Sequence, residues 1–250
     1  MTDLVLRRDQ GRAVELVLNR PDKLNALNVA SFQALEAHVA ALEADPPGVV
    51  VLRGAGRCFC AGHDLSDIAA GERLPRPNYQ SHVIERLADL PLPVISVVHG
   101  HCYTGGLELA LAGDIILAAE GARFADTHAK WALTPVWGLS QRLPRRVGTY
   151  RARELMFTCR TVGGREAERI GLADLCAPDA ELDATLEGLV GDILANSSFS
   201  HAANKRLLRE SDGLPLAAGL AREIYYGEGR GPDMAERIAA FKRKEAKVGG

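Results

Sequence analysis

The chain has 250 residues, of which 47% are hydrophobic and 25% charged, enough for one large domain or a domain with a small appendage. The formal net charge of −2 gives no overall attraction to nucleic acid or to an anionic membrane, so we expect neither as a partner. No uncharged apolar run reaches the roughly 18 residues of a membrane span. The start of the chain lacks the apolar stretch of a secretory signal.

The first part of the chain is predicted to alternate strands and helices. Residues 13–18 have the pattern of a strand, and apolar residues at helical spacing predict a helix over 29–44, capped by Asn28 or Ser31. A second helix is predicted over 79–90. Short apolar runs, typical of strands buried on both faces, occur at residues 49–52, 94–98 and 115–118. Strands and helices in alternation indicate an α/β body.

The rest of the chain is predicted to be almost entirely helical. Helices are expected over residues 149–158, 164–170, 182–195, 199–209, 216–226 and 234–244. We interpret residues 1–195 as the α/β core domain and residues 196–250 as a helical C-terminal region.

The five cysteines are an odd number, and none belongs to a CxxC pair. Cys58 and Cys60 are two residues apart, a spacing that matches neither a zinc site nor a redox motif. We therefore expect buried free thiols, a reducing compartment and a cytoplasmic protein without a bound metal.

Two glycine-containing turns follow buried strands, at residues 57–65 and 100–108. Ligands of α/β proteins usually bind at the carboxyl ends of parallel strands, and glycine lets a backbone N–H approach a ligand closely. Two such amides directed at one oxygen would form an oxyanion hole. The alternative is that both turns are purely structural. Neither turn fits a nucleotide-binding motif, and the chain has no GxSxG elbow.

Glu108 is expected in the first turn of a helix over residues 107–112, with Gly113 as its C-terminal cap. Its carboxylate could compensate the helix dipole, which contributes about 0.3–1 kcal/mol. Alternatively it could act as a general base beside an oxyanion site.

Together these segments resemble the crotonase (enoyl-CoA hydratase/isomerase) superfamily, in the family's order over most of the chain. The resembling stretches are NRPDKLNAL (19–27), FCAGHDL (59–65), PVI (93–95), GGLELA (105–110), DI (114–115), ARF (122–124), QRLP (141–144), VG (147–148) and GLA (171–173). The resemblance implies a crotonase-like spiral of ββα turns. It also implies that the helices of residues 196–250 build a homotrimer, or a homohexamer of two trimers.

The resemblance further implies an acyl-CoA thioester as substrate, with coenzyme A belonging to the substrate and no other cofactor. The amides of His63 and Gly105 would hold the thioester oxygen, so the imidazole of His63 is not needed. The residues implied to contact the substrate or coenzyme A are Lys23, Leu24, Ala26, Ala61, Gly62, Asp64 and Leu65. Lys205, and Lys244 of a neighbouring subunit, are further candidates for the phosphates.

The chain departs from the family pattern at the second catalytic position. Hydratases of the family resemble one another in using two glutamates; the first is Glu108 here, and His128 occupies the place of the second. His128 could replace the missing acid, because imidazole donates protons near neutral pH. Asp126 could supply the carboxylate instead, or the role could be vacant. The alternative for His128 is an ordinary exposed histidine.

Bulky residues form a second departure. Trp137 and Leu139 stand where the family has small residues, and would restrict the acyl group or favour a flat one if they face the pocket. Trp131 is expected in the core. We therefore expect hydration of a 2,3-unsaturated acyl-CoA. The alternatives are double-bond isomerisation, decarboxylation, thioester hydrolysis, or acyl-CoA binding without turnover.

Overall fold

The computed structural model describes the backbone of residues 3–248 and the side chains of residues 3–243. A six-stranded sheet has the order β1-β2-β3-β4-β6-β9, in which β1 is antiparallel to β2 and the other neighbours are parallel. Its strands are β1 (Val5–Gln10), β2 (Ala13–Leu18), β3 (Val49–Gly54), β4 (Val94–Val98), β6 (Ile115–Ala119) and β9 (Leu175–Ala177). Every residue of β2 and β4 is buried, as expected for parallel strands covered on both faces.

A small second sheet consists of β5 (His101–Tyr103), β7 (Arg123–Ala125) and β8 (Val162–Gly163), in that order. These strands are too short to show periodicity, so the sequence does not predict them. β5 carries the second glycine turn and β7 leads directly to Asp126, so this sheet brings two functional segments together.

The helices of the body follow the predicted pattern closely. They are α1 (Val29–Ala44), α2 (Leu65–Ala69), α3 (Tyr79–Asp89), α4 (Gly105–Ala110), α5 (Leu139–Val147), α6 (Thr149–Thr158), α7 (Gly164–Arg169) and α8 (Leu182–Ala195), with 3-10 turns at η1 (Pro21–Lys23), η2 (His128–Trp131) and η3 (Asp179–Glu181). Asn28 caps α1, because its side chain accepts a hydrogen bond of 2.9 Å from the Ser31 amide. Helices α2 and α5 are not among those predicted from the sequence, and α5 contains Pro144.

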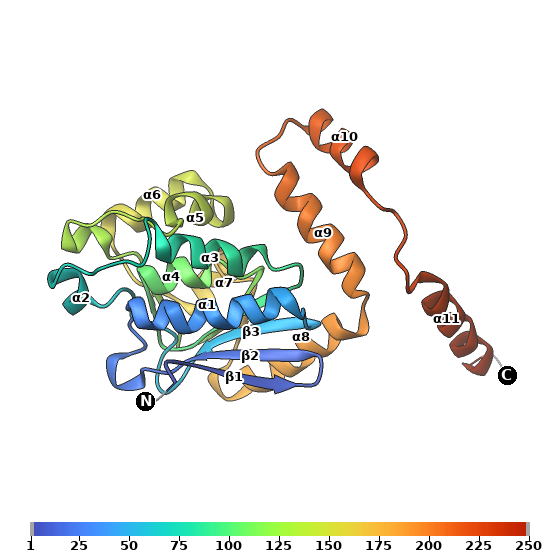
Figure 1. Cartoon of the computed structure of the whole chain (residues 1–250), viewed down its shortest axis with the longest axis horizontal. Helices are drawn as coiled ribbons and strands as arrows, with labels where there is room; N and C mark the ends of the chain where they lie inside the picture. Colours follow the sequence, from blue (N-terminus) through green and yellow to red (C-terminus); the bar gives the residue numbers. More distant parts are fainter. Residues whose placement is uncertain (1–2, 249–250) are drawn as a thin grey trace.

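The core lies between the large sheet and the helices α1 and α3, seen in front of the strands in Figure 1. Its fully buried aromatic side chains include Phe32, Phe59 and Phe124. Burial of each side chain of this size stabilises the fold by about 1.5–3 kcal/mol. All five cysteines are free and four are buried, as expected.

Two local predictions are wrong. Gly113 does not cap α4, because the helix ends at Leu111 in a right-handed conformation; the glycine instead allows close packing, since a Cβ on it would lie 2.5 Å from Ser96 Oγ. Trp131 is not a core residue, because 56% of its surface is exposed.

The C-terminal region consists of α9 (Ser198–Ser211), α10 (Leu216–Tyr226) and α11 (Met234–Val248). Lys205 ties α9 to the body by donating to the Leu92 carbonyl at 3.0 Å and to Asp114 Oδ2 at 2.7 Å. Figure 1 shows α10 and α11 standing away from the body. The boundary at residue 195 between the core domain and the C-terminal region remains a prediction. Within the described chain, no helix combines the length and apolar character needed to cross a membrane.

Candidate active site

The two glycine turns lie side by side. The Tyr103 amide donates to the Cys60 carbonyl at 3.0 Å. The backbones of Cys60 and Cys102 form an isolated parallel β-bridge. Gly62 has φ +112°, and a Cβ on it would lie 2.9 Å from the Tyr103 carbonyl oxygen. Glycine is therefore required at this position both for the backbone conformation and for the close approach of the turns.

The amides of His63 and Gly105 are neighbours in this arrangement. A Cβ on Gly105 would lie only 3.2 Å from His63 N. Within residues 3–248 neither amide donates a hydrogen bond, and both residues line a pocket of about 380 Å³. The structure thus brings together the two amides predicted for an oxyanion hole.

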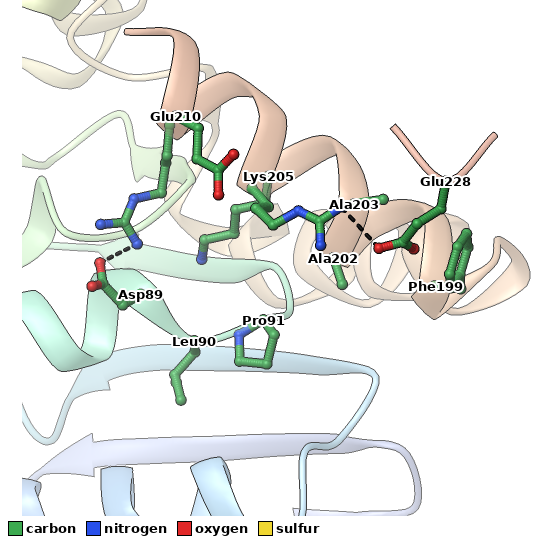
Figure 2. A pocket seen from close by; sticks show the side chains of 11 residues that line it. Asp89, Leu90, Pro91, Phe199, Ala202, Ala203, Lys205, Glu210 and Glu228 are labelled. Carbon is green, nitrogen blue, oxygen red and sulfur yellow. Dashed lines mark ion pairs between the residues drawn. The ribbon is translucent and has the colours of Figure 1, made fainter. Parts of the chain in front are cut away.

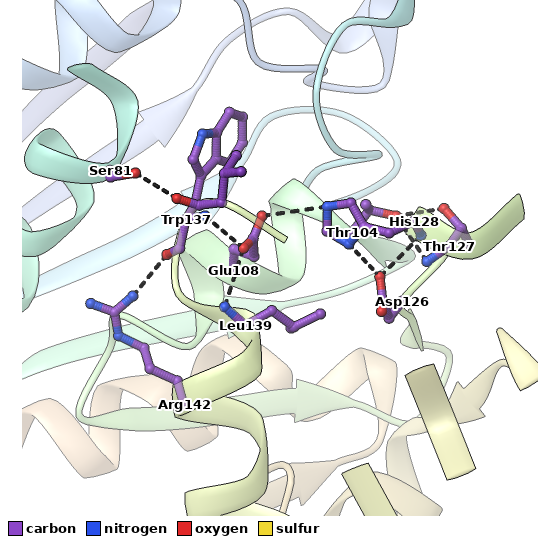
Figure 3. A network of polar contacts seen from close by, with 10 residues as sticks. Ser81, Thr104, Glu108, Asp126, Thr127, His128, Trp137, Leu139 and Arg142 are labelled. Carbon is purple, nitrogen blue, oxygen red and sulfur yellow. Dashed lines mark hydrogen bonds and ion pairs between the residues drawn. The ribbon is translucent and has the colours of Figure 1, made fainter. Parts of the chain in front are cut away.

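Glu108 projects from α4 into the same pocket and is almost fully buried. Its Oε1 accepts hydrogen bonds from the amides of Trp137 at 2.9 Å and Leu139 at 3.1 Å, as Figure 3 shows. Burial raises the pKa of Glu108 above its usual value of 4.5, and the two amides oppose this rise. A buried carboxylate facing a pocket is not a solvated acid that only compensates a helix dipole.

His128 lies opposite Glu108, with 3.8 Å between its Nε2 and Glu108 Oε2. It is buried rather than exposed at a loop surface. Its Nδ1 lies 2.6 Å from Asp126 Oδ1, which also accepts the His128 amide at 3.1 Å. Because a carboxylate only accepts hydrogen bonds, we assign a proton to Nδ1, which faces Asp126. The other ring nitrogen, Nε2, faces Glu108.

Asp126 positions the His128 ring through the contact at Nδ1. Its side chain is 2% exposed, and Asp126 is not among the residues that line the pocket. The sequence offered Asp126 and His128 as alternatives for one position. In the structure they form a pair in which only His128 reaches the pocket.

Trp137 faces the pocket with its ring and holds Glu108 with its backbone. The ring centroid lies 4.8 Å from that of His63 and 4.9 Å from that of Phe32. A Cβ on Gly105 would meet Trp137 Cζ3 at 2.4 Å, so the ring packs directly against this turn. Leu139 is buried outside the pocket lining and contributes only its amide. Trp131 is exposed and lines the pocket, a place that the sequence does not predict for it.

Two of the residues implied to bind coenzyme A, Ala61 and Leu65, line the pocket. Leu24 runs beside them, because its carbonyl accepts the Ala61 amide at 2.9 Å. Lys23, Ala26 and Gly62 belong to the same two neighbouring segments but do not line the pocket. Asp64 caps α2 through the Ser66 amide and pairs with Arg20 at 3.0 Å, so its visible contacts are structural.

Lys205 does not reach this pocket. Figure 2 shows it lining a different cavity, of about 530 Å³, between α9 and residues 89–91. Its ammonium is held by Asp114 and the Leu92 carbonyl, and burial lowers its pKa despite the nearby Asp114 carboxylate. The side chain of Lys244 lies outside the described residues.

Two threonines of the pocket were not singled out from the sequence. Thr104 and Thr127 both line it, and their Oγ1 atoms lie 2.5 Å apart. Thr104 directly precedes the two glycines of the second turn, where its β-branched side chain could have been noticed.

Known proteins resemble this chain over nearly its whole length. The family model described as enoyl-CoA hydratase/isomerase matches residues 9–229. A relative named "Probable enoyl-CoA hydratase" from Rhodobacter capsulatus is 35% identical, covering 94% of this chain and 93% of its own. The "1,2-epoxyphenylacetyl-CoA isomerase" of Escherichia coli is 30% identical, over 98% of each chain.

The structural comparison extends the likeness to the fold. The crystal structure of an enoyl-CoA hydratase from Mycobacterium tuberculosis has a TM-score of 0.89 and 30% identity, covering 97% of both chains. The α/β fold with a helical extension is thus the crotonase-like fold that the sequence predicts. The matched family model spans both glycine turns, Glu108 and His128, and on this evidence the chain belongs to the enoyl-CoA hydratase/isomerase family.

Proposed function

We propose that this protein adds water to the double bond of 2,3-unsaturated acyl-CoA thioesters, and catalyses the reverse reaction. The observation that carries the proposal is the 3.8 Å separation of Glu108 Oε2 and His128 Nε2 beside the free amides of His63 and Gly105. That separation is too long for a direct hydrogen bond and suits one bridging water. No metal or redox group takes part in the proposed chemistry.

The amides of His63 and Gly105 stabilise the negative charge that forms on the thioester oxygen. Removal of one such donor costs other enzymes roughly 2.7–4 kcal/mol in the transition state. The ring of Trp137, packed over this turn, keeps bulk water away from it. This step does not require the side chain of His63.

Glu108 and His128 share one mobile proton in the proposed cycle. The Glu108 carboxylate takes a proton from water while the water oxygen bonds to C3. Protonated His128 delivers its Nε2 proton to C2. The proton on Glu108 then returns to His128 across the 3.8 Å gap through a water, which restores the starting state. Asp126 stabilises the imidazolium through Nδ1.

The direct test follows the loss of the enoyl thioester absorbance of crotonyl-CoA. We expect turnover by the native protein, and a loss of about 10²–10⁴-fold in Glu108→Gln and His128→Ala, the range for acid–base groups. Glu187→Gln, an exposed carboxylate on α8, is the matched control and should leave the rate unchanged. Binding of crotonyl-CoA without hydration would reject this reaction.

Double-bond isomerisation is the second candidate. A relative of 30% identity is named as the isomerase of an epoxide, 1,2-epoxyphenylacetyl-CoA, so relatives at this level of similarity catalyse reactions other than hydration. With a β,γ-unsaturated acyl-CoA, a Glu–His pair can also take a proton from C2, leaving a dienolate, and return a proton to C4. A β,γ-unsaturated acyl-CoA as substrate, with product analysis, separates this reaction from hydration.

We further propose a cytoplasmic homotrimer or homohexamer. Supporting evidence comes from α10 and α11, whose exposed apolar side chains include Ile224 (72%), Tyr225 (80%) and Phe241 (61%). Apolar surface of this extent favours burial against another chain. Light scattering on the purified protein would give the mass, and a monomer that binds acyl-CoA normally would contradict the assembly. The free thiols support a reducing compartment.

A further inference from the structure

The hydroxyl pair of Thr104 and Thr127 connects the two catalytic parts of the pocket. Thr104 immediately precedes Gly105, and Thr127 immediately precedes His128. Their Oγ1 atoms are 2.5 Å apart, and the Thr127 amide donates to Thr104 Oγ1 at 3.1 Å. The Thr104 amide in turn donates to the Ala125 carbonyl at 2.8 Å. Figure 3 shows this pair beside Asp126 and His128.

Thr104 occupies a conformation that suits glycine better than threonine. Its φ is +52° and its ψ is −110°, outside the regions that β-branched residues favour. Backbone conformation therefore does not account for a threonine at this position. Among the described residues, the Thr104 side chain makes polar contacts with Thr127 alone.

One hydroxyl proton of the pair has no acceptor among the side chains and backbone that the structure describes. Two hydroxyls supply two protons, and the contact between them uses one. Neither hydroxyl donates to any other group among the described residues. Both side chains line the pocket that contains Glu108 and His128, so the remaining proton is available to a ligand there.

We propose that the Thr104–Thr127 pair is a hydrogen-bond donor subsite for an oxygen on C3 of the acyl group. This inference rests on the proposed function, in which that oxygen is the attacking water and then the hydroxyl of the product. It also defines a class of ligand: acyl thioesters with oxygen on C3 bind more tightly than saturated ones. The donor fixes the direction of the oxygen while Glu108 removes its proton.

The test compares the affinities of acetoacetyl-CoA and butyryl-CoA by calorimetry, because they differ only by oxygen at C3 and neither can be hydrated. We expect Thr127→Val and Thr104→Gly to weaken acetoacetyl-CoA binding about 3- to 10-fold, as for loss of one hydrogen bond, with butyryl-CoA binding unchanged. Thr127→Ser keeps the hydroxyl and should retain native affinities. Thr104→Gly relieves the strained backbone, so it should still fold.

Thr149→Val is the matched control, because Thr149 is exposed on α6 and does not line the pocket. It should leave both affinities unchanged. Equal weakening of the two ligands in Thr127→Val, or no change in their ratio, would overturn the subsite. The hydration assay is read separately: a protein that fails to hydrate crotonyl-CoA but loses acetoacetyl-CoA affinity in the variants contradicts only the proposed reaction.

Discussion

The two walls of the pocket are built from different chemical groups. One wall presents the backbone amides of His63 and Gly105, which two tight glycine turns bring together. The other presents the side chains of Glu108 and His128, each fixed by further contacts behind it. The first wall functions only while the space next to the two amides is free of other protein atoms. The second depends on the presence of particular ionisable groups.

This difference determines how each wall can be disrupted. An amide wall loses function when atoms are added, because a new Cβ displaces the backbone or fills the space of the ligand oxygen. It tolerates changes in side chains that merely extend away from it. The side-chain wall behaves in the opposite way, since loss of one carboxylate or imidazole removes a proton-transfer step.

Among changes to the first wall, the largest effect is expected from Gly105→Ala. The added Cβ would lie 2.4 Å from Trp137 Cζ3 and 3.2 Å from His63 N, so the amide, the ring or both must move. We expect kcat for crotonyl-CoA hydration to fall about 10²–10³-fold, as on loss of an oxyanion donor. Gly191→Ala, a helical site where a Cβ meets nothing within 4 Å, is the control. Activity within tenfold of native would contradict an oxyanion role for this turn.

A smaller effect is expected from Asp126→Asn, which alters the second wall indirectly. The amide can no longer stabilise an imidazolium, and it permits the wrong tautomer of His128. We expect kcat to fall about 10- to 100-fold with little change in KM, because Asp126 does not contact the substrate. A pH profile of kcat should also shift. Loss of activity without that shift, accompanied by a lower melting temperature, would indicate a purely structural role.

Much of the first wall could be predicted from the sequence, because its signals are local. Apolar runs identify buried strands such as β4, and the glycines after them identify close backbone approaches. The Asn28 cap and the limits of α1 are equally local. The pairing of Asp126 with His128 required knowledge of which way each side chain points, and residue spacing does not supply that.

The environments that could not be predicted from the sequence are those set by distant parts of the chain. Lys205 has the sequence context of a surface lysine, but its partner Asp114 lies 91 residues earlier. Trp131 is the last residue of the 3-10 turn η2 and is exposed, and the residue after it, Ala132, has a left-handed conformation that is unusual for alanine. The strain at Thr104 likewise depends on the packing of both turns rather than on its neighbours in sequence.

His63→Ala should have a much smaller effect than either change above. It removes an imidazole that contacts Glu72 at 3.0 Å and the Trp137 ring, but it leaves the amide in place. We expect kcat to stay within about threefold of native, because the backbone is the donor. His128→Ala is the informative comparison, since it removes an imidazole from the other wall. Equal losses in the two variants would show that the walls do not differ as described.

The smallest effect concerns stability and distinguishes the buried carboxylate of the second wall from an ordinary one. Burial raises the pKa of Glu108 above 4.5, so the folded protein keeps a proton that the unfolded chain releases as the pH rises. The stabilising contribution of protonated Glu108 is therefore present below about pH 4.5 and is lost as the pH rises through the folded pKa. Glu108→Gln keeps an oxygen for the amides of Trp137 and Leu139 and carries no ionisable group. As the pH rises above about 4.5, its melting temperature should increase relative to that of the native protein, whereas that of Glu187→Gln should follow the native curve. Parallel curves for native protein and Glu108→Gln would mean that the Glu108 carboxylate ionises at its usual pH, so that burial does not distinguish it from an exposed carboxylate such as Glu187.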